Sequence, residues 1–259
     1  MGSIGKVYIT GAGPGDPDLL TIRARQVLEC ADLVVYDNLL NRELLTICPE
    51  YTRLCYAGKK PGAHHMRQEA INTLLVTESM NGKQVVRLKG GDPFIFGRGA
   101  EEALELRAKG IPYEIIPGIS AGNAVPAYAG IPLTFRGLSS SVVFVTGSED
   151  PLKDKCNVDW KTLARLNSTL VLYMAVANLT KITSALLKYG MDPNMPAAII
   201  QSGTTYKQVI LHSELAAIAH QAVQAKIVSP AIVIIGKVAG LGTQLEWFQT
   251  RSALSVSDY

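Results

Sequence analysis

A glycine-rich turn near the amino terminus is the first place where this sequence could bind a ligand. It reads Gly-Ala-Gly-Pro-Gly-Asp over residues 11–16 and follows a predicted strand at residues 4–10. The turn is similar to a dinucleotide fingerprint, but Asp16 stands where that fingerprint needs its third glycine. Its charge would repel a pyrophosphate at a helix N-terminus, so a nicotinamide-dependent dehydrogenase is disfavoured. The alternative is a purely structural strand-to-helix turn.

A second glycine turn ends the strand predicted at residues 83–88. Gly90 and Gly91 carry no side chain, so the backbone could approach a ligand closely. Asp92 adds a carboxylate, which suits a ligand with hydroxyl and ammonium groups better than a phosphate. An ordinary turn is the alternative. Two glycine turns that both end strands predict a pocket at the carboxyl edge of a sheet.

Two further side chains could take part in proton transfer. Asp37 follows an apolar strand predicted at residues 32–36, and it could act as a general base or orient another group. A turn or helix cap is the alternative for this aspartate. Lys59 lies between Gly58 and Pro61 in a loop, where a mobile cation could contact a substrate. A solvated surface lysine is the alternative there.

Charge is concentrated in one part of the chain. The 259 residues carry 25 basic and 22 acidic side chains, a formal net charge of +3. Residues 53–98 hold eight basic and three acidic side chains, a local charge of +5, so the rest of the chain sums to −2. Some of these charges must belong to solvated faces. No long Lys/Arg stripe or aromatic RNA-binding motif is present, so a nucleic-acid partner is not expected.

Composition excludes several classes of protein. With 47% hydrophobic and 18% charged residues, the chain is not a disordered one. No apolar run approaches the ~18 residues that a membrane-spanning helix needs, and no signal peptide is visible. The four cysteines and four histidines lack the spacing of a metal site or a disulfide framework. We therefore expect a cytoplasmic protein with no metal and no membrane partner.

The elements that must position these residues are short β-branched runs alternating with helical patterns. In the first half, further helices are predicted after Asp16, at 66–80 and at 99–109, and a further strand at 113–116. In the second half, strands are predicted at 141–146, 169–174 and 231–235, a hairpin at 197–201 and 208–212, and helices at 179–188 and 213–221. The alternation predicts two α/β domains, at residues 1–117 and 118–248, with a loose tail at 249–259.

Three segments together resemble the tetrapyrrole methylases. They are Val7 to Pro17, Arg87 to Gly99, and Ile116 to Ala121, and residues 129–134 and 203–208 add to the match. The resemblance implies two α/β domains, the first with a mainly parallel sheet and the second with a mixed one. It also implies that S-adenosylmethionine binds in a cleft between them, and that the protein is a homodimer.

The resemblance also implies which residues bind the cofactor. They come from the three segments and from two places in the second domain: Pro14, Gly90, Gly91, Asp92, Ile95, Ser120, Ala121, Met174 and Gly203. Met174 would pack against the adenine as a soft apolar surface, and a plain core position is the alternative for it.

The implied reaction is methylation of two pyrrole carbons of uroporphyrinogen III, which gives precorrin-2 through a mono-methylated intermediate. Asp37 would accept a proton and Lys59 would donate one. Arg87, Arg98 and Lys59 are the preferred contacts for the substrate's eight carboxylates. Ala100, Phe135 and Ser148 depart from the family pattern, which affects only the expected substrate contacts.

Other functions remain open at this point. A later corrin-ring methylase, or a methylase acting on ribosomal RNA or diphthine, would share the fold. A protein that binds S-adenosylmethionine or a tetrapyrrole without turnover is an alternative outside the enzymes, and so is an α/β protein whose glycine turns are only structural. The sequence is expected to be a stand-alone methyltransferase, because it lacks the dehydrogenase and ferrochelatase module of fused sirohaem synthases.

Overall fold

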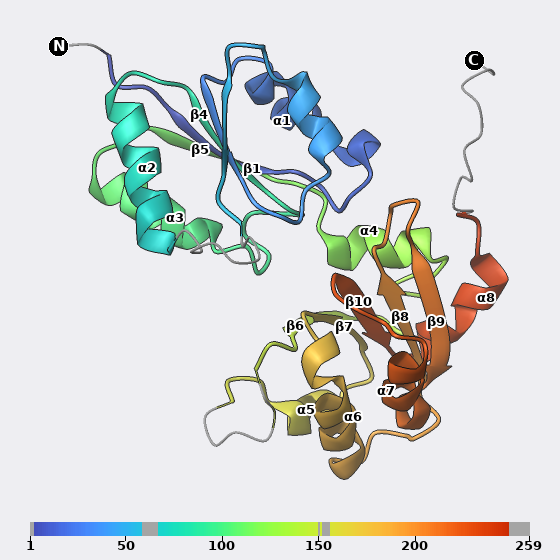
Figure 1. Cartoon of the computed structure of the whole chain (residues 1–259). Helices are drawn as coiled ribbons and strands as arrows, with labels where there is room; N and C mark the ends of the chain where they lie inside the picture. The colour runs from blue at the N-terminus through green and yellow to red at the C-terminus, as the bar shows by residue number, and fades with distance from the viewer. Residues whose placement is uncertain (1–2, 59–66, 150, 152–155, 249–259) are drawn as a thin grey trace, which may run out of the picture. The chain divides into compact units, whose positions relative to one another are not determined.

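The chain forms two compact units, Met1–Ala121 and Gly122–Tyr259 (Figure 1). The computed structural model describes residues 3–58, 67–149, 151 and 156–248. The predicted domain boundary, between residues 117 and 118, lies close to the division between the two units.

The first unit is built on a five-stranded sheet whose strands are all parallel. In spatial order the strands are β3 (Arg53–Tyr56), β2 (Leu33–Tyr36), β4 (Val85–Lys89), β1 (Val7–Gly11) and β5 (Tyr113–Ile116). The central strands are covered on both faces, and all five residues of β4 are buried. Strands covered in this way are apolar runs, which is why the sequence predicts four of the five.

Helices cover both faces of this parallel sheet (Figure 1). On one face, α2 (Gln68–Met80) and α3 (Gly99–Ala108) pack against the strands through buried residues that include Leu75. On the other face, α1 (Ile22–Leu28) contributes its buried Leu28 to a second core cluster. Because the sheet is sandwiched, only the ends of its strands are available to form a site.

The start of the first helix differs from the sequence-based prediction. Asp16 caps a 3-10 turn, η1 (Pro17–Leu19), and not an α-helix. Helix α1 begins only after Thr21, whose Oγ1 accepts a hydrogen bond from Ala24 N at 3.2 Å. Strand β3 was not predicted at all, because it lies at the sheet edge and its first two residues are exposed.

The second unit contains a mixed sheet. Its order is β6 (Val142–Thr146), β7 (Thr169–Tyr173), β10 (Ala231–Ile235), β8 (Pro196–Gln201) and β9 (Val209–Glu214). Strands β6 and β7 are parallel, whereas β10 is antiparallel to both of its neighbours. Strands β8 and β9 form the predicted hairpin.

Three helices pack against one face of the mixed sheet in a single hydrophobic cluster: α5 (Trp160–Arg165), α6 (Leu179–Lys188) and α7 (Leu215–Gln224). Helix α4 (Ala121–Tyr128) contacts β7, since Gly122 N donates a hydrogen bond to Tyr173 Oη at 2.8 Å. The remaining short elements are η2 (Arg42–Ile47), η3 (Val176–Asn178), η4 (Lys237–Leu241) and α8 (Gly242–Leu245).

The predicted fold class is confirmed: two α/β units, the first with a parallel sheet and the second with a mixed one. Among the residues that the structure describes, no helix is long and apolar enough to cross a membrane.

Candidate active site

The carboxyl edge of the parallel sheet collects the sequence motifs of the first unit. Parallel strands all end at the same edge, so the segments that follow them are neighbours in space. Residues 12–15 follow β1, Asp37 follows β2 and residues 90–92 follow β4, while residues 117–120 follow β5. The residues of these four segments therefore come together at one edge.

The glycine turns after β1, β4 and β5 pack backbone against backbone. Gly13 N donates to Gly91 O at 3.2 Å, and Gly91 N donates to Gly13 O at 2.7 Å, which makes an isolated antiparallel bridge between two turns. A Cβ added at Gly11 would lie 2.5 Å from Gly118 Cα, and one added at Gly118 would collide with Gly91 O. Glycine is needed at these positions first of all so that the turns can approach one another.

Asp92 joins two of these turns. One oxygen of its carboxylate, Oδ1, accepts a hydrogen bond from Phe94 N at 2.8 Å. The other, Oδ2, accepts one from Gly118 N at 3.0 Å. The carboxylate is therefore fixed between the turn after β4 and the turn after β5. Each oxygen keeps a second lone pair for a ligand donor.

The other predicted cofactor residues of the first unit lie around this junction. Pro14, Ser120 and Ala121 are partly exposed, and Ile95 is exposed. Gly91 has a left-handed backbone with φ +67°, and a Cβ added there would meet Ala121 N at 3.7 Å.

Asp37 caps a turn and also faces a cation. Its Oδ1 accepts a hydrogen bond from Leu39 N at 3.0 Å, so the capping interpretation is correct as far as it goes. Its Oδ2 lies 3.8 Å from a terminal guanidinium nitrogen of Arg87, and 27% of the side chain is exposed. The carboxylate thus has one oxygen held by the backbone and one directed at a buried positive charge.

Arg87 belongs to a buried charged cluster that sequence reasoning did not identify. Its Nε donates to Glu102 Oε1 at 3.0 Å, and the same oxygen accepts from Lys89 Nζ and from Gln68 Nε2, each at 3.1 Å. The Arg87 side chain is only 5% exposed, so a direct contact with a substrate carboxylate would have to use the nitrogen nearest Asp37.

The two cations of this cluster, but not their partner, could be recognised in the sequence. Arg87 and Lys89 alternate along β4, so they point to the same face of a strand that is otherwise apolar. Two cations on a covered face require a buried anion, and Glu102 on α3 supplies it. Burial, and next the charge of Arg87, lower the pKa of Lys89 below its ordinary value, while Glu102 and Asp37 act in the opposite direction.

Arg98 occupies an exposed position just before α3. It has a left-handed backbone with φ +59°, and its guanidinium pairs with Glu101 through contacts of 2.9 Å and 2.7 Å. This pairing raises the pKa of Arg98 above its ordinary value. Lys59 lies outside the described residues, and so its predicted roles stay predictions.

The two predicted cofactor residues of the second unit follow β7 and β8. Met174 comes directly after β7, has a left-handed backbone with φ +55° and is 49% exposed, so within this unit it is not a core residue. Gly203 is buried, and a Cβ added there would collide with Val125. The turn is held by Gln208, which accepts from Thr204 N at 2.8 Å.

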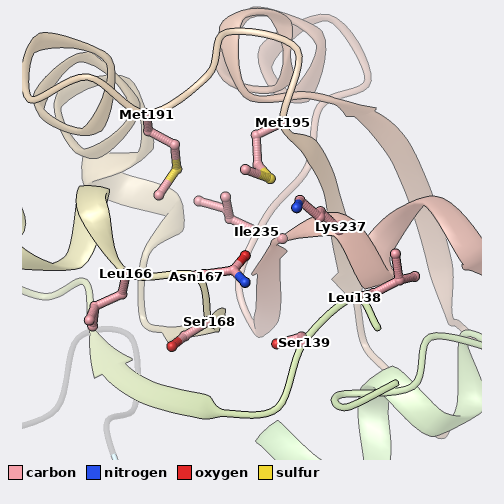
Figure 2. A pocket seen from close by; sticks show the side chains of 10 residues that line it. Leu138, Ser139, Leu166, Asn167, Ser168, Met191, Met195, Ile235 and Lys237 are labelled. Carbon is pink, nitrogen blue, oxygen red and sulfur yellow. The ribbon is translucent and has the colours of Figure 1, made fainter. Parts of the chain in front are cut away.

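A pocket in the second unit contains none of the predicted site residues (Figure 2). Met191 and Met195 line it from the loop between α6 and β8, while Ser168 lies just before β7. The pocket is therefore at the end of β7 opposite to Met174. No group of three or more His, Cys, Asp or Glu residues that could hold a metal occurs in the described part of the chain.

Comparisons with known proteins give the family. Residues 6–219 match the model of the tetrapyrrole (corrin/porphyrin) methylases. A uroporphyrinogen-III C-methyltransferase of Bacillus subtilis is 48% identical over 250 residues, which cover 95% of this chain and 96% of that protein. An S-adenosyl-L-methionine-dependent uroporphyrinogen III methyltransferase of Methanosarcina barkeri is 46% identical, with 93% of this chain and 94% of that protein covered.

A solved structure points to the same family as these two relatives. The uroporphyrin-III C-methyl transferase of Thermus thermophilus, complexed with S-adenyl homocysteine, superposes with a TM-score of 0.75 at 36% identity. The match covers 90% of this chain and 93% of that one. This chain therefore belongs to the tetrapyrrole methylase family.

Proposed function

We propose that the protein transfers methyl groups from S-adenosylmethionine to two pyrrole carbons of uroporphyrinogen III, forming precorrin-2 through a mono-methylated intermediate. The observation that carries this proposal is the 48% identity along nearly the whole length of a uroporphyrinogen-III C-methyltransferase. Its product would supply the biosynthesis of sirohaem or cobalamin.

The residues at the carboxyl edge fit S-adenosylmethionine. That cofactor has an ammonium group, a carboxylate, ribose hydroxyls and an adenine. The turns offer the fixed carboxylate of Asp92, partly exposed Ser120 and space beside Gly91, where an added Cβ would meet Ala121 N at 3.7 Å as its nearest described neighbour. In the second unit, exposed Met174 offers a thioether for an aromatic ring. When bound, the cofactor would supply a methyl group on a sulfonium, which is already a good leaving group.

The protein's own residues would orient the substrate and move protons. Attack by an electron-rich pyrrole carbon on the methyl group leaves the tetrapyrrole with a proton to lose. Asp37 is proposed to accept a proton, because Oδ2 is free of the backbone contact that holds Oδ1. Lys59 is proposed as the proton donor. Acid–base help of this kind is worth about 100- to 10,000-fold in rate.

The substrate's carboxylates would be bound by basic side chains near this edge. Arg98 and Lys59 are proposed contacts, and Arg87 would contribute through the nitrogen that faces Asp37. The exposed pair of Arg98 and Glu101 keeps a guanidinium at the beginning of α3, where it can exchange its partner for a substrate carboxylate at little cost. A cytoplasmic homodimer is proposed as the working form.

The test is anaerobic incubation of the purified protein with uroporphyrinogen III and isotope-labelled S-adenosylmethionine. Mass spectrometry should detect a product with two added methyl groups, and a singly methylated species at early times. A later corrin-ring methylase would leave uroporphyrinogen III unmodified but would methylate a precorrin. A protein that binds both ligands without forming any methylated product would overturn the proposal.

A further inference from the structure

The buried cluster behind Asp37 contains an unusual carboxylate. Glu102 is fully buried, and its Oε1 accepts three hydrogen bonds, from Arg87, Lys89 and Gln68. Its Oε2 has no hydrogen-bond partner among the described residues. A buried carboxylate with one unsatisfied oxygen is costly, and replacement of such a cluster by apolar residues is often neutral or stabilising. Stability alone therefore does not explain why the charges are there.

The contacts of Arg87 fix the orientation of its guanidinium group. Nε donates to Glu102, and one terminal nitrogen donates to Val35 O at 3.3 Å and Leu88 O at 3.1 Å. The remaining nitrogen lies 3.8 Å from Asp37 Oδ2. These contacts bind Nε and one terminal nitrogen to the protein interior, and the guanidinium is held with its other terminal nitrogen toward Asp37.

We propose that Glu102 is a positioning residue for methyl transfer: it holds Arg87 and Lys89 behind Asp37 and so sets the strength of Asp37 as a base. The proposal rests on the proposed role of Asp37 as proton acceptor. Glu102 itself is fully buried, so it acts on the proton transfer indirectly, through its hydrogen bond with Arg87.

The direction of the effect follows from the charges near Asp37. Arg87 faces it from β4, the charge of Lys89 on the same strand interacts with it electrostatically, and Glu102 on α3 pairs with both cations. On the β3 side the described chain reaches Gly58, and the proposed proton donor Lys59 comes next. The one carboxylate of Glu102 offsets the two cations of β4. Without that anion, the cations stabilise the ionised form of Asp37 more strongly, and this carboxylate becomes a weaker base.

The decisive variant is Glu102→Gln, which keeps the shape of the side chain and removes its charge. Because Glu102 acts on Asp37 through Arg87, the acidic limb of the kcat/KM profile should move to lower pH. The maximal rate should fall about tenfold, within the range that general base catalysis contributes. The dissociation constant for S-adenosylmethionine, measured by calorimetry, should stay within about twofold, since the hydrogen bonds that fix Asp92 come from Phe94 N and Gly118 N and not from the Glu102 cluster.

Two further variants separate positioning from loss of structure. Glu105→Gln removes a charge one turn further along α3, outside the cluster, and should leave the rate and profile unchanged. Arg87→Lys keeps the positive charge but loses the forked contact with both carboxylates, so the acidic limb should move in the opposite direction, to higher pH. A lower rate for Glu102→Gln with an unmoved limb would overturn the proposal, as would an equal loss of cofactor affinity.

A double variant distinguishes this proposal from the one on which it rests. Asp37→Asn alone tests the base: if it retains the full rate, the role of Asp37 fails. If Asp37→Asn is slow, Glu102→Gln in that background should add little further loss, because both changes act on the same proton transfer. If the rate loss of the double variant equals the product of the two single losses, Glu102 acts on a step other than proton transfer to Asp37. Circular dichroism of each variant checks folding, and Arg87→Lys decides the question if Glu102→Gln does not fold.

Discussion

The carboxylate of Asp92 accepts a hydrogen bond from the backbone N–H of Gly118 at 3.0 Å, and this contact ties the turn after β4 to the turn after β5. The two residues are far apart in the sequence and belong to two different motifs. Their contact means that the carboxylate proposed to bind the cofactor also fixes the shape of the place where it would bind.

Replacement of Asp92 should therefore weaken cofactor binding strongly. In Asp92→Ala, both the turn contact and the ligand contact are lost, and hydrogen bonds to charged groups are worth about 1.5–3 kcal/mol each. The dissociation constant for S-adenosylmethionine, measured by calorimetry, should rise at least about tenfold. Asp18→Ala, at an exposed position of η1, is the control and should bind normally. Normal binding by Asp92→Ala would remove this residue from the proposed site.

The packing of the glycine turns predicts a large difference between two Gly→Ala substitutions. At Gly118 the new methyl group would collide with Gly91 O and lie 2.8 Å from Gly11 Cα, so three turns would have to move apart. At Gly110, which has φ +68° and where an added Cβ would meet no described atom within 4 Å, only backbone strain of about 1–2 kcal/mol is added. Urea unfolding should give a clearly larger loss of stability for Gly118→Ala. Equal losses would contradict the close packing of the turns.

Asp37→Asn should separate turnover from cofactor binding. Asparagine can still accept the hydrogen bond from Leu39 N, so the turn should survive, but it cannot take up a proton. Turnover should fall about 100-fold or more, with nearly unchanged affinity for S-adenosylmethionine. Asp192→Asn is a matched control, because Asp192 accepts from Asn194 N in the same kind of turn. Full activity in Asp37→Asn would refute the role of proton acceptor.

A carboxylate at the sheet edge should make stability depend on pH. Arg23, and next Lys6, lower the pKa of Glu114 to about 2. Because this pKa is depressed in the folded state, the stabilisation is complete above the ordinary pKa of the carboxyl group, 4.5, and is lost as pH falls toward 2. The melting temperature of Glu114→Gln should therefore lie below that of the unaltered protein at pH 7, and the difference should shrink from about pH 4.5 downward. A difference that does not change with pH would exclude this ion pair as its source.

Much of the fold could be predicted because its strands and helices have strong local patterns. Helix α6 has its predicted bounds, 179–188, and β10 has its predicted bounds, 231–235, since both are marked by apolar periodicity. Strand β3 lacks such a run, because it is an edge strand whose first residues face solvent. The beginning of α1 was misplaced because Asp16 and Pro17 are typical of a helix start, yet here they cap a 3-10 turn.

The candidate site was predictable where a motif is continuous in the sequence and not where a pair is formed across elements. The glycine turns and Asp92 could be predicted because each lies in a short continuous motif. The same holds for Asp37, which directly follows an apolar strand. The pairing of Lys89 with Glu102 was not, because charged residues usually lie on solvated faces. Only the sheet and helix packing makes them partners, with both side chains almost completely buried.

The interlocked turns around Gly11, Gly91 and Gly118 also limit how the candidate site can be redesigned. Each turn packs against the other two and depends on them for its conformation. A single loop taken from a related methylase would therefore lack the neighbouring turns that fix its conformation. Exchange of substrate or cofactor preference between relatives would have to transplant the three segments as a set. For this protein, the smallest interchangeable part is therefore the whole carboxyl edge of the sheet.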